Sequence, residues 1–285
     1  MSRYRQRRYA RPPSLIREAN MWAELTSKPL FIGILNLTPD SFSDGGRFVD
    51  PSAALAQARA LAQAGARMLD LGAESTRPGA AVVDAATEWA RLEHVLAALT
   101  EALPGLPLSL DTRHAAVAER GLAAGVSVIN DVTGFTHPAM LELAQCFPCG
   151  LIAMRSRRAD DGLLMPPYTD PAPKTAEAAF QELAAVRDRL RGAGIPDGRV
   201  LLDPGFGFGT TFAEDLALWE ALPQLPEALA WPADRICIGI SRKRFLAARA
   251  GVPELPPARR DALTTAAHAQ ALGWGYRVFR THAIG

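Results

Sequence analysis

Short runs of branched apolar residues alternate with alanine-rich helical stretches along the whole chain, and this alternation is the strongest constraint on its fold. We predict strands at 30–35, 67–71, 107–110, 126–129, 150–154, 199–202, 235–240 and 276–279. The helical stretches lie near 51–64, 86–102, 113–124, 137–146, 174–193, 213–222 and 258–272. Repeated strand–helix alternation requires a parallel sheet with helical crossovers. Eight strands in 285 residues favour an α/β fold of the (β/α)₈ TIM barrel type. Strand counting leaves an open doubly wound sheet as the alternative.

The two ends of the chain depart from a regular barrel. The sequence ends at Gly285, soon after the eighth predicted strand, so we expect the eighth helix to be missing. Segment 13–26 has a helical pattern that includes Leu15, Ile16 and Trp22. Because the first and eighth strands are neighbours in a closed barrel, we expect this N-terminal helix to cover the gap. We therefore predict a basic disordered arm at 1–12 and a single barrel domain at 13–285.

Composition excludes several classes of protein. No run of about 18 apolar residues occurs, so we expect no membrane span. The N-terminus is basic but lacks the apolar segment of a secretory signal, which predicts a cytoplasmic protein. Six arginines lie within residues 1–17, yet the net charge of the chain is only +1. We interpret the basic arm as a solvated tail and expect no nucleic-acid partner.

Polar residues follow the predicted strands at the points where each strand ends. In a parallel barrel these points meet at one mouth, which holds the active site. A carboxylate or amide placed directly behind a buried strand is costly unless it has a partner, so general loop polarity does not explain the pattern. The candidates are Asn36, Arg77, Asp111, Asn130, Asp131, Met154, Asp203, Ser241, Lys243, Arg280 and His282.

The charges at this mouth are of two kinds. Arg77, Lys243, Arg280 and His282 are cationic donors suited to a phosphate or pyrophosphate. The carboxylates of Asp111, Asp131 and Asp203, with the Asn130 amide, suit the N–H groups of a nitrogen-rich heterocycle. We therefore expect a ligand with one anionic end and one amino-heterocyclic end.

Other motifs carry less information. The glycine-rich stretch 205–209 is neither a dinucleotide-binding fingerprint nor a P-loop, so we interpret it as a turn that lets a ligand approach closely. A Ser-His-Asp triad stays open, although no nucleophile-elbow motif supports one. No metal-binding spacing of His or Cys residues is present.

Seven strings in the chain resemble the signature segments of the dihydropteroate synthase family, in the same order. They are GILNLTPDSFSDGG (33–46), GAESTRPG (72–79), SLDT (109–112), IND (129–131), LLDPGFGFG (201–209), SRK (241–243) and RTH (280–282). Together they span essentially the whole barrel. Ordered strings of this length are far more specific than a short motif.

The resemblance implies a (β/α)₈ enzyme that joins dihydropterin hydroxymethyl pyrophosphate to p-aminobenzoate and releases pyrophosphate. It implies that the pterin is held by Asp111, Asn130, Met154, Asp203 and Lys243. It implies that pyrophosphate is bound by Asn36, Arg77, Arg280 and His282, with Mg²⁺ at Asn36. It implies that p-aminobenzoate lies among Thr76, Pro78, Phe206 and Ser241. The catalytic set would be Asp111, Arg77, Lys243, Arg280 and His282, and the family is a target of sulfonamides.

Three departures from the family pattern leave alternatives open. After Met154 the chain reads Arg155 and Ser156 where His and Met are usual, Thr210 stands where Lys is common, and the final helix is absent. The missing helix leaves a homodimer open as the assembly. A pterin-binding paralogue with weak or no synthase activity is the first alternative. A pterin-dependent methyltransferase is the second, although it would not need the two family loops at 33–46 and 72–79.

Overall fold

The computed structural model describes residues 21–38, 50–75, 82–157 and 175–284. Its strands are β1 (Leu30–Asn36), β2 (Met68–Gly72), β3 (Leu108–Asp111), β4 (Val128–Asp131), β5 (Gly150–Met154), β6 (Val200–Asp203), β7 (Cys237–Ile238) and β8 (Val278–Thr281). Its α-helices are α1 (Met21–Leu25), α3 (Pro51–Gln63), α4 (Ala85–Ala102), α5 (Ala115–Ala123), α6 (Pro138–Cys146), α7 (Ala176–Gly192), α8 (Phe212–Ala221), α9 (Leu225–Leu229), α10 (Arg244–Arg249) and α11 (Asp261–Gly273). The predicted arm at 1–12 lies outside the described residues.

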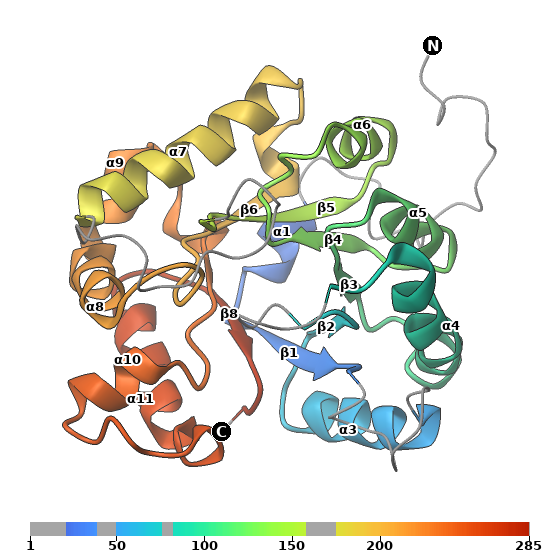
Figure 1. Cartoon of the computed structure of the whole chain (residues 1–285), viewed down its shortest axis with the longest axis horizontal. Coiled ribbons are helices and arrows are strands. Elements are labelled where there is room, and N and C mark those ends of the chain that lie inside the picture. The colour runs from blue at the N-terminus through green and yellow to red at the C-terminus, as the bar shows by residue number, and fades with distance from the viewer. Residues whose placement is uncertain (1–20, 39–49, 76–81, 158–174, 285) are drawn as a thin grey trace.

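The strands form one parallel sheet in the order β6-β5-β4-β3-β2-β1-β8-β7. A parallel bridge between Leu202 and Ile236 joins its two ends, so the sheet curls into a nearly closed barrel. Figure 1 shows the strands in the middle of the molecule, ringed by helices. The predicted (β/α)₈ barrel is confirmed, and the open sheet is excluded.

Several helices begin at side chains suited to capping. Asp84 accepts from the backbone N–H of Thr87 at the start of α4, and Thr175 accepts from Ala178 at the start of α7. At α8, Thr211 and Glu214 form a reciprocal capping box. Each of these side chains satisfies a backbone donor that the first turn of the helix leaves unpaired.

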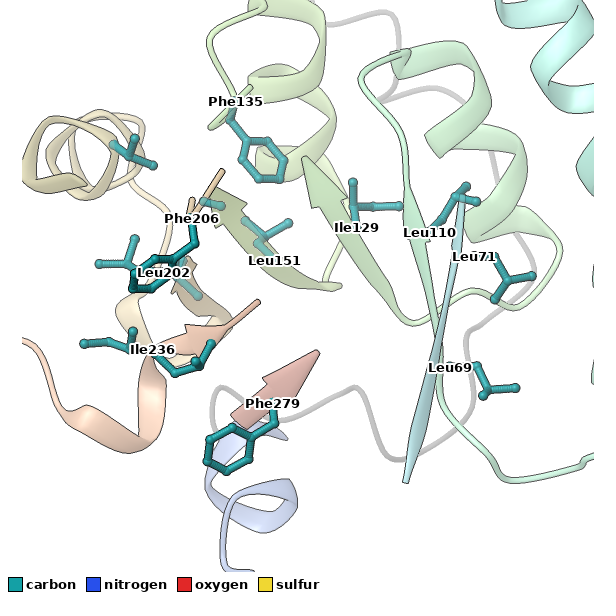
Figure 2. Close-up of a cluster of buried hydrophobic side chains, with 14 of the residues drawn as sticks. Leu69, Leu71, Leu110, Ile129, Phe135, Leu151, Leu202, Phe206, Ile236 and Phe279 are labelled. Carbon is teal, nitrogen blue, oxygen red and sulfur yellow. The ribbon is translucent and has the colours of Figure 1, made fainter. Parts of the chain in front are cut away.

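Alternate residues of each strand divide between two apolar cores. The larger core lies between the strands and the helices, and Figure 2 shows its side chains, including Leu110, Ile129 and Leu151, spread around the barrel. The smaller core contains alternate strand residues such as Ile32, Met68 and Val128. Because side chains alternate across a strand, this smaller core fills the interior of the barrel.

Helix α1 closes the amino-terminal end of this interior. The Trp22 side chain is fully buried within the smaller core, and its indole N–H donates to the backbone oxygen of Arg199 at 2.8 Å. Met21 and Trp22 pack against Gly150 at the start of β5, where a side chain would collide with them. Figure 1 shows α1 within the ring of strands. The described part of the predicted helix, residues 21–25, therefore lies at the end of the barrel, and residues 13–20 lie outside the described residues.

Residues 282–284, which follow β8 in the described chain, contain no helix. Outside the neighbouring strands β1 and β8, the ring of Phe31 on β1 stacks on the ring of Phe279 on β8, with centroids 5.5 Å apart. His268 of α11 packs against Phe279 at 4.7 Å. None of the helices in the described ranges is long and apolar enough to cross a membrane.

Candidate active site at the carboxyl ends of the strands

The inner face of the barrel changes from apolar to polar along β2, β4 and β8. Met68 on β2 is followed two residues later by Asp70, and Val128 on β4 is followed by Asn130. The same step leads from Val278 on β8 to Arg280. The mouth is therefore a polar layer that rests on an apolar layer, and its ionised groups are held in partly desolvated surroundings.

Arg280 links the carboxylates of two other strands. Its Nε donates to Oδ2 of Asp70 at 2.6 Å, and its Nη2 donates to Oδ2 of Asp111 at 2.8 Å. The Asn130 amide also donates to Oδ2 of Asp70, at 2.9 Å. The mouth of the barrel thus contains a four-residue cluster, Arg280–Asp70–Asp111–Asn130, drawn from β8, β2, β3 and β4.

Burial and like charge act together on Asp111. Desolvation raises the pKa of its carboxyl group to about 7; the Arg280 cation opposes this shift, and the charges of Asp70 and Glu88 add to it. Burial alone would lower the pKa of Arg280, but the carboxylates of Asp70 and Asp111 raise it overall. Arg280 therefore stays charged, while Asp111 changes its charge near neutral pH.

Asp203 and Lys243 form the opposite side of the mouth. The carboxylate of Asp203 accepts from the backbone N–H of Gly205 at 2.8 Å, and burial raises its pKa. The Nζ of Lys243 lies 4.3 Å from the ring centroid of Phe208. Burial lowers the pKa of Lys243 to about 8, and the carboxylate of Asp215 opposes this shift. The charges of Asp203 and Lys243 each act on the pKa of the other, so the two side chains share one desolvated region.

His282 is paired with Ser241. The Ser241 hydroxyl lies 3.0 Å from the backbone N of His282 and 3.0 Å from its Nδ1. Burial, with the nearby cations Arg242 and Arg280, lowers the pKa of His282 to about 3. This shift favours a neutral imidazole at neutral pH in the substrate-free protein, and the role of His282 toward pyrophosphate stays a prediction.

Three further predicted residues lie in different surroundings. Asn36, the last residue of β1, is half-buried. Met154, the last residue of β5, is buried beside Gly205. Phe206 is fully buried and stacks on Phe245 with ring centroids 5.3 Å apart. Phe206 thus belongs to the apolar core in this structure, whereas Phe208 is half-buried beneath Lys243.

Thr76, Arg77 and Pro78 lie outside the described residues, but the two ends of their segment are described. Glu74, before it, accepts from the backbone N–H of Val83, after it, at 3.1 Å. Glu74 also receives two hydrogen bonds from Arg113, at 2.7 and 2.9 Å. These contacts tie both ends of the segment to the start of α5.

Sequence reasoning missed Asp70 and assigned Asp131 to the ligand. Asp70 stands inside the predicted strand 67–71, and the alternation with Met68 was the signal that it faces the interior. The carboxylate of Asp131 accepts from the backbone N–H groups of Thr133 and Phe135, so it stabilises the turn after β4. Its hydrogen bonds therefore serve the fold.

A model of the family described as pterin binding enzyme matches residues 32–282, so the barrel and its polar mouth define a pterin-binding enzyme. The chain is 38% identical over 261 residues to the dihydropteroate synthase of Neisseria meningitidis serogroup C, and the match covers 90% of this chain and 88% of the relative. It belongs to the dihydropteroate synthase family, as the signature strings predict.

Solved structures agree in fold. The dihydropteroate synthase of Xanthomonas albilineans with 4-aminobenzoic acid has a TM-score of 0.79 at 36% identity, and the match covers 91% of this chain and 89% of that one. The Thermus thermophilus enzyme in complex with 6HMPPP has a TM-score of 0.72 at 35% identity, covering 91% and 90%. The synthase function predicted from the strings is confirmed at the level of the family.

Proposed function

We propose that the mouth of this barrel joins dihydropterin hydroxymethyl pyrophosphate to p-aminobenzoate and releases pyrophosphate. The observation that carries the proposal is the Arg280–Asp70–Asp111–Asn130 cluster, in which a cation and buried carboxylates stand side by side. Such a cluster suits a ligand with an anionic end and a cationic or N–H-rich end. Relatives solved with 4-aminobenzoic acid and with 6HMPPP support the same pair of substrates.

The pterin would be held by Asp111, Asn130, Asp203 and Lys243, with Met154 beside it. The Asn130 amide nitrogen already donates to Asp70, which leaves its oxygen to accept from an N–H of the ring. The carboxylate of Asp203 accepts one backbone N–H and has further acceptor capacity. These groups match the donors along one edge of an amino-heterocycle.

Pyrophosphate would be bound by Asn36, Arg77, Arg280 and His282. Two of the five N–H donors of a guanidinium are used by carboxylates at Arg280, so others can meet phosphate oxygens. Neutral His282 would contribute an N–H, because the Ser241 hydroxyl is positioned to donate to Nδ1 and so to leave the proton on Nε2. A bound anion would also favour protonation of this ring.

Mg²⁺ would enter with the pyrophosphate. The described residues contain no group of three His, Cys, Asp or Glu side chains that could hold a metal. Asn36 offers one amide oxygen at the mouth, and Mg²⁺ commonly combines few protein oxygens with substrate phosphates and water. When bound, the ion would supply neutralisation of charge on the leaving anion.

The arylamine would lie among Thr76, Pro78, Phe206 and Ser241. With Phe206 buried in the described conformation, Phe208 is the aromatic side chain of this loop that is open to a ligand. Sulfonamides would compete for this position, and a sulfonamide complex of the Yersinia pestis synthase supports that expectation.

The reaction breaks the C–O bond between the pterin methylene and pyrophosphate, and the electron pair leaves with pyrophosphate. The lone pair of the amine then forms the C–N bond, and the amine loses a proton to solvent. Ionised Asp111 favours the positive charge that develops on the pterin, while Arg280 favours the departing anion. Only interactions that strengthen toward the transition state raise the rate.

The test is to incubate the pure protein with Mg²⁺ and both substrates and to measure dihydropteroate and pyrophosphate. Asp111→Asn should keep the fold and lose about 10²–10³ in kcat, by analogy with the loss of one oxyanion-hole donor. Pterin binding without turnover in the unmodified chain would leave the non-catalytic paralogue as the answer. Absence of condensation, together with methyl transfer in a separate incubation with a methylated pterin donor, would indicate the methyltransferase.

Assembly and location are proposed separately. We propose a homodimer, which sedimentation of the pure protein would test directly. We also propose that the protein is cytoplasmic and that residues 13–285 form one domain, and limited proteolysis would reveal a boundary within it.

A further inference from the structure

The loops that follow β5 and β6 are joined along their backbones. The N–H of Arg155 donates to the backbone oxygen of Asp203 at 3.0 Å, and that of Arg157 donates to Phe208 at 3.3 Å. A side chain at Gly205 would overlap the carbonyl oxygen of Arg155, and Gly205 has a φ of 70°. The close approach and the positive φ both require glycine at this position.

Alternating charges reinforce this junction. Arg155 donates through Nε to the backbone oxygen of Pro204 at 2.8 Å and through Nη1 to Glu182 of α7 at 2.6 Å. Arg157 donates to Glu214 of α8 at 2.7 Å and lies 3.5 Å from the other oxygen of Glu182. We call Arg155, Glu182, Arg157 and Glu214 the charge ladder.

The charge ladder is mostly shielded from water. The side chains of Arg155, Arg157 and Glu214 are 3%, 10% and 5% exposed, and only Glu182 reaches 28%. Low exposure means that the ladder is weakly screened and that each member depends on its partners. Solvent-exposed ion pairs contribute little and do not hold a loop in one position. The shielded ion pairs of the charge ladder can hold the loops after β5 and β6 in place.

The charge ladder contacts the residues that form one side of the mouth. Arg155 touches the backbone of Pro204, next to Asp203, and its charge opposes the upward shift that burial imposes on the pKa of Asp203. Lys243 and Arg280 oppose that shift as well. At the other end of the loop, the backbone oxygen of Phe208 accepts from the backbone N–H of Arg157. The ammonium group of Lys243 lies over the ring of Phe208.

We propose that Arg155 is a positioning residue for pterin binding: by joining the loops after β5 and β6, it sets where Asp203 and Lys243 meet the ligand. Arg157 does the same for the Phe208 end of the loop. This inference rests on the proposed function of the mouth. It also gives a role to the departure at Arg155, one of the positions at which this sequence differs from the family pattern.

The experiment uses the full chain and follows the Kd of the pterin pyrophosphate by calorimetry, together with KM for each substrate. Arg155→Met should raise the pterin Kd about 10-fold, as the loss of a supporting contact does at other sites, with a smaller change in KM for p-aminobenzoate. The acid limb that Asp203 contributes to pterin binding should move to higher pH, because Asp203 loses a neighbouring cation, while the limb near pH 7 that belongs to Asp111 should stay in place. Arg155→Lys should restore the limb, because it restores the charge.

Glu182→Gln covers the case in which Arg155→Met does not fold, since Glu182 is partly exposed. It should weaken pterin binding in the same direction by a smaller factor. Arg191→Gln is the matched control, because its ion pair with Asp197 involves the same helix but is 41% and 50% exposed. This control should leave the pterin Kd unchanged.

A folded Arg155→Met variant with unchanged pterin Kd and unchanged acid limb would overturn the inference. Equal losses for both substrates, with no recovery in Arg155→Lys, would also overturn it by pointing to a general loss of structure. If the unmodified chain neither binds the pterin pyrophosphate nor turns it over, the proposed function itself has failed. The two failures are therefore distinguishable.

Discussion

Asp70→Asn offers the sharpest test of the electrostatics at the mouth. Asp70 is fully buried, and its Oδ2 accepts from both Arg280 and Asn130. A hydrogen bond to a charged group contributes about 1.5–3 kcal/mol. Asparagine keeps the shape of the side chain, and Arg280 keeps its contact with Asp111, so we expect stability to fall by about 2–3 kcal/mol.

The same substitution should change the titration of Asp111. Asp70 raises the pKa of Asp111, so the removal of its charge lowers that pKa. Once Arg280 no longer pairs with a charged Asp70, it acts more strongly on the carboxylate of Asp111 and lowers the pKa of Asp111 further. We expect the acid limb of kcat/KM for the pterin pyrophosphate to lie near pH 7 in the unmodified protein and to move down by about one pH unit, or about 1.4 kcal/mol.

The assay is kcat/KM between pH 5 and 9, with urea unfolding at each pH to confirm that the variant is folded. Asp111→Asn is the control, because it removes the titrating group and should abolish the acid limb together with most of the activity. A folded Asp70→Asn variant whose acid limb stays near pH 7, or moves up, would refute the assignment of this limb to Asp111.

Three further predictions concern stability and metal dependence. Burial lowers the pKa of His268 to about 4, below its usual value of 6.5. The unfolded chain therefore binds a proton at this residue more readily than the folded chain does. As the pH falls from 6.5 toward 4, this difference lowers the free energy of unfolding. His268→Phe should remove about 2 kcal/mol of the difference in urea-unfolding free energy between pH 7 and pH 5; an unchanged difference would contradict this. Trp22→Ala should cost about 3–5 kcal/mol in the same assay, because the indole fills the end of the barrel, and a loss below about 1 kcal/mol would argue against that role. Removal of Mg²⁺ by EDTA should raise KM for the pterin pyrophosphate and leave the melting temperature unchanged; a fall in melting temperature would indicate a structural metal instead.

The alternation of strands and helices was sufficient to predict the barrel, because each period is a local property of the sequence. Boundaries were less accurate: Asp111 and Asp203 close their strands, where the sequence suggested that they follow them. Helices α9 and α10 were missed because they are only 5 and 6 residues long and give no clear periodicity. The position of α1 depends on tertiary packing, since an apolar helix is equally compatible with the outside of the barrel and its end.

The position of the candidate site was predictable from the sequence, but the contacts between its side chains were not. Residues at strand ends converge in any parallel barrel, so Asp111, Asn130 and Arg280 could be expected at one mouth. Which carboxylate Arg280 contacts depends on strand order and side-chain length, and the sequence contains no local sign of either. The neutral state of His282 likewise depends on burial and on cations from the segment after β7.

The Arg280 cluster has a consequence for synthesis of the chain. Arg280 is separated from Asp111 by 169 residues and from Asp70 by 210. A nascent chain that has completed β7 but not β8 has two unpaired sheet edges and lacks the cation that pairs with Asp70 and Asp111. Long-range contacts of this kind form late and leave aggregation-prone intermediates. We therefore expect the barrel to become both soluble and competent to bind substrate only in the last step of its folding, when β8 docks between β1 and β7.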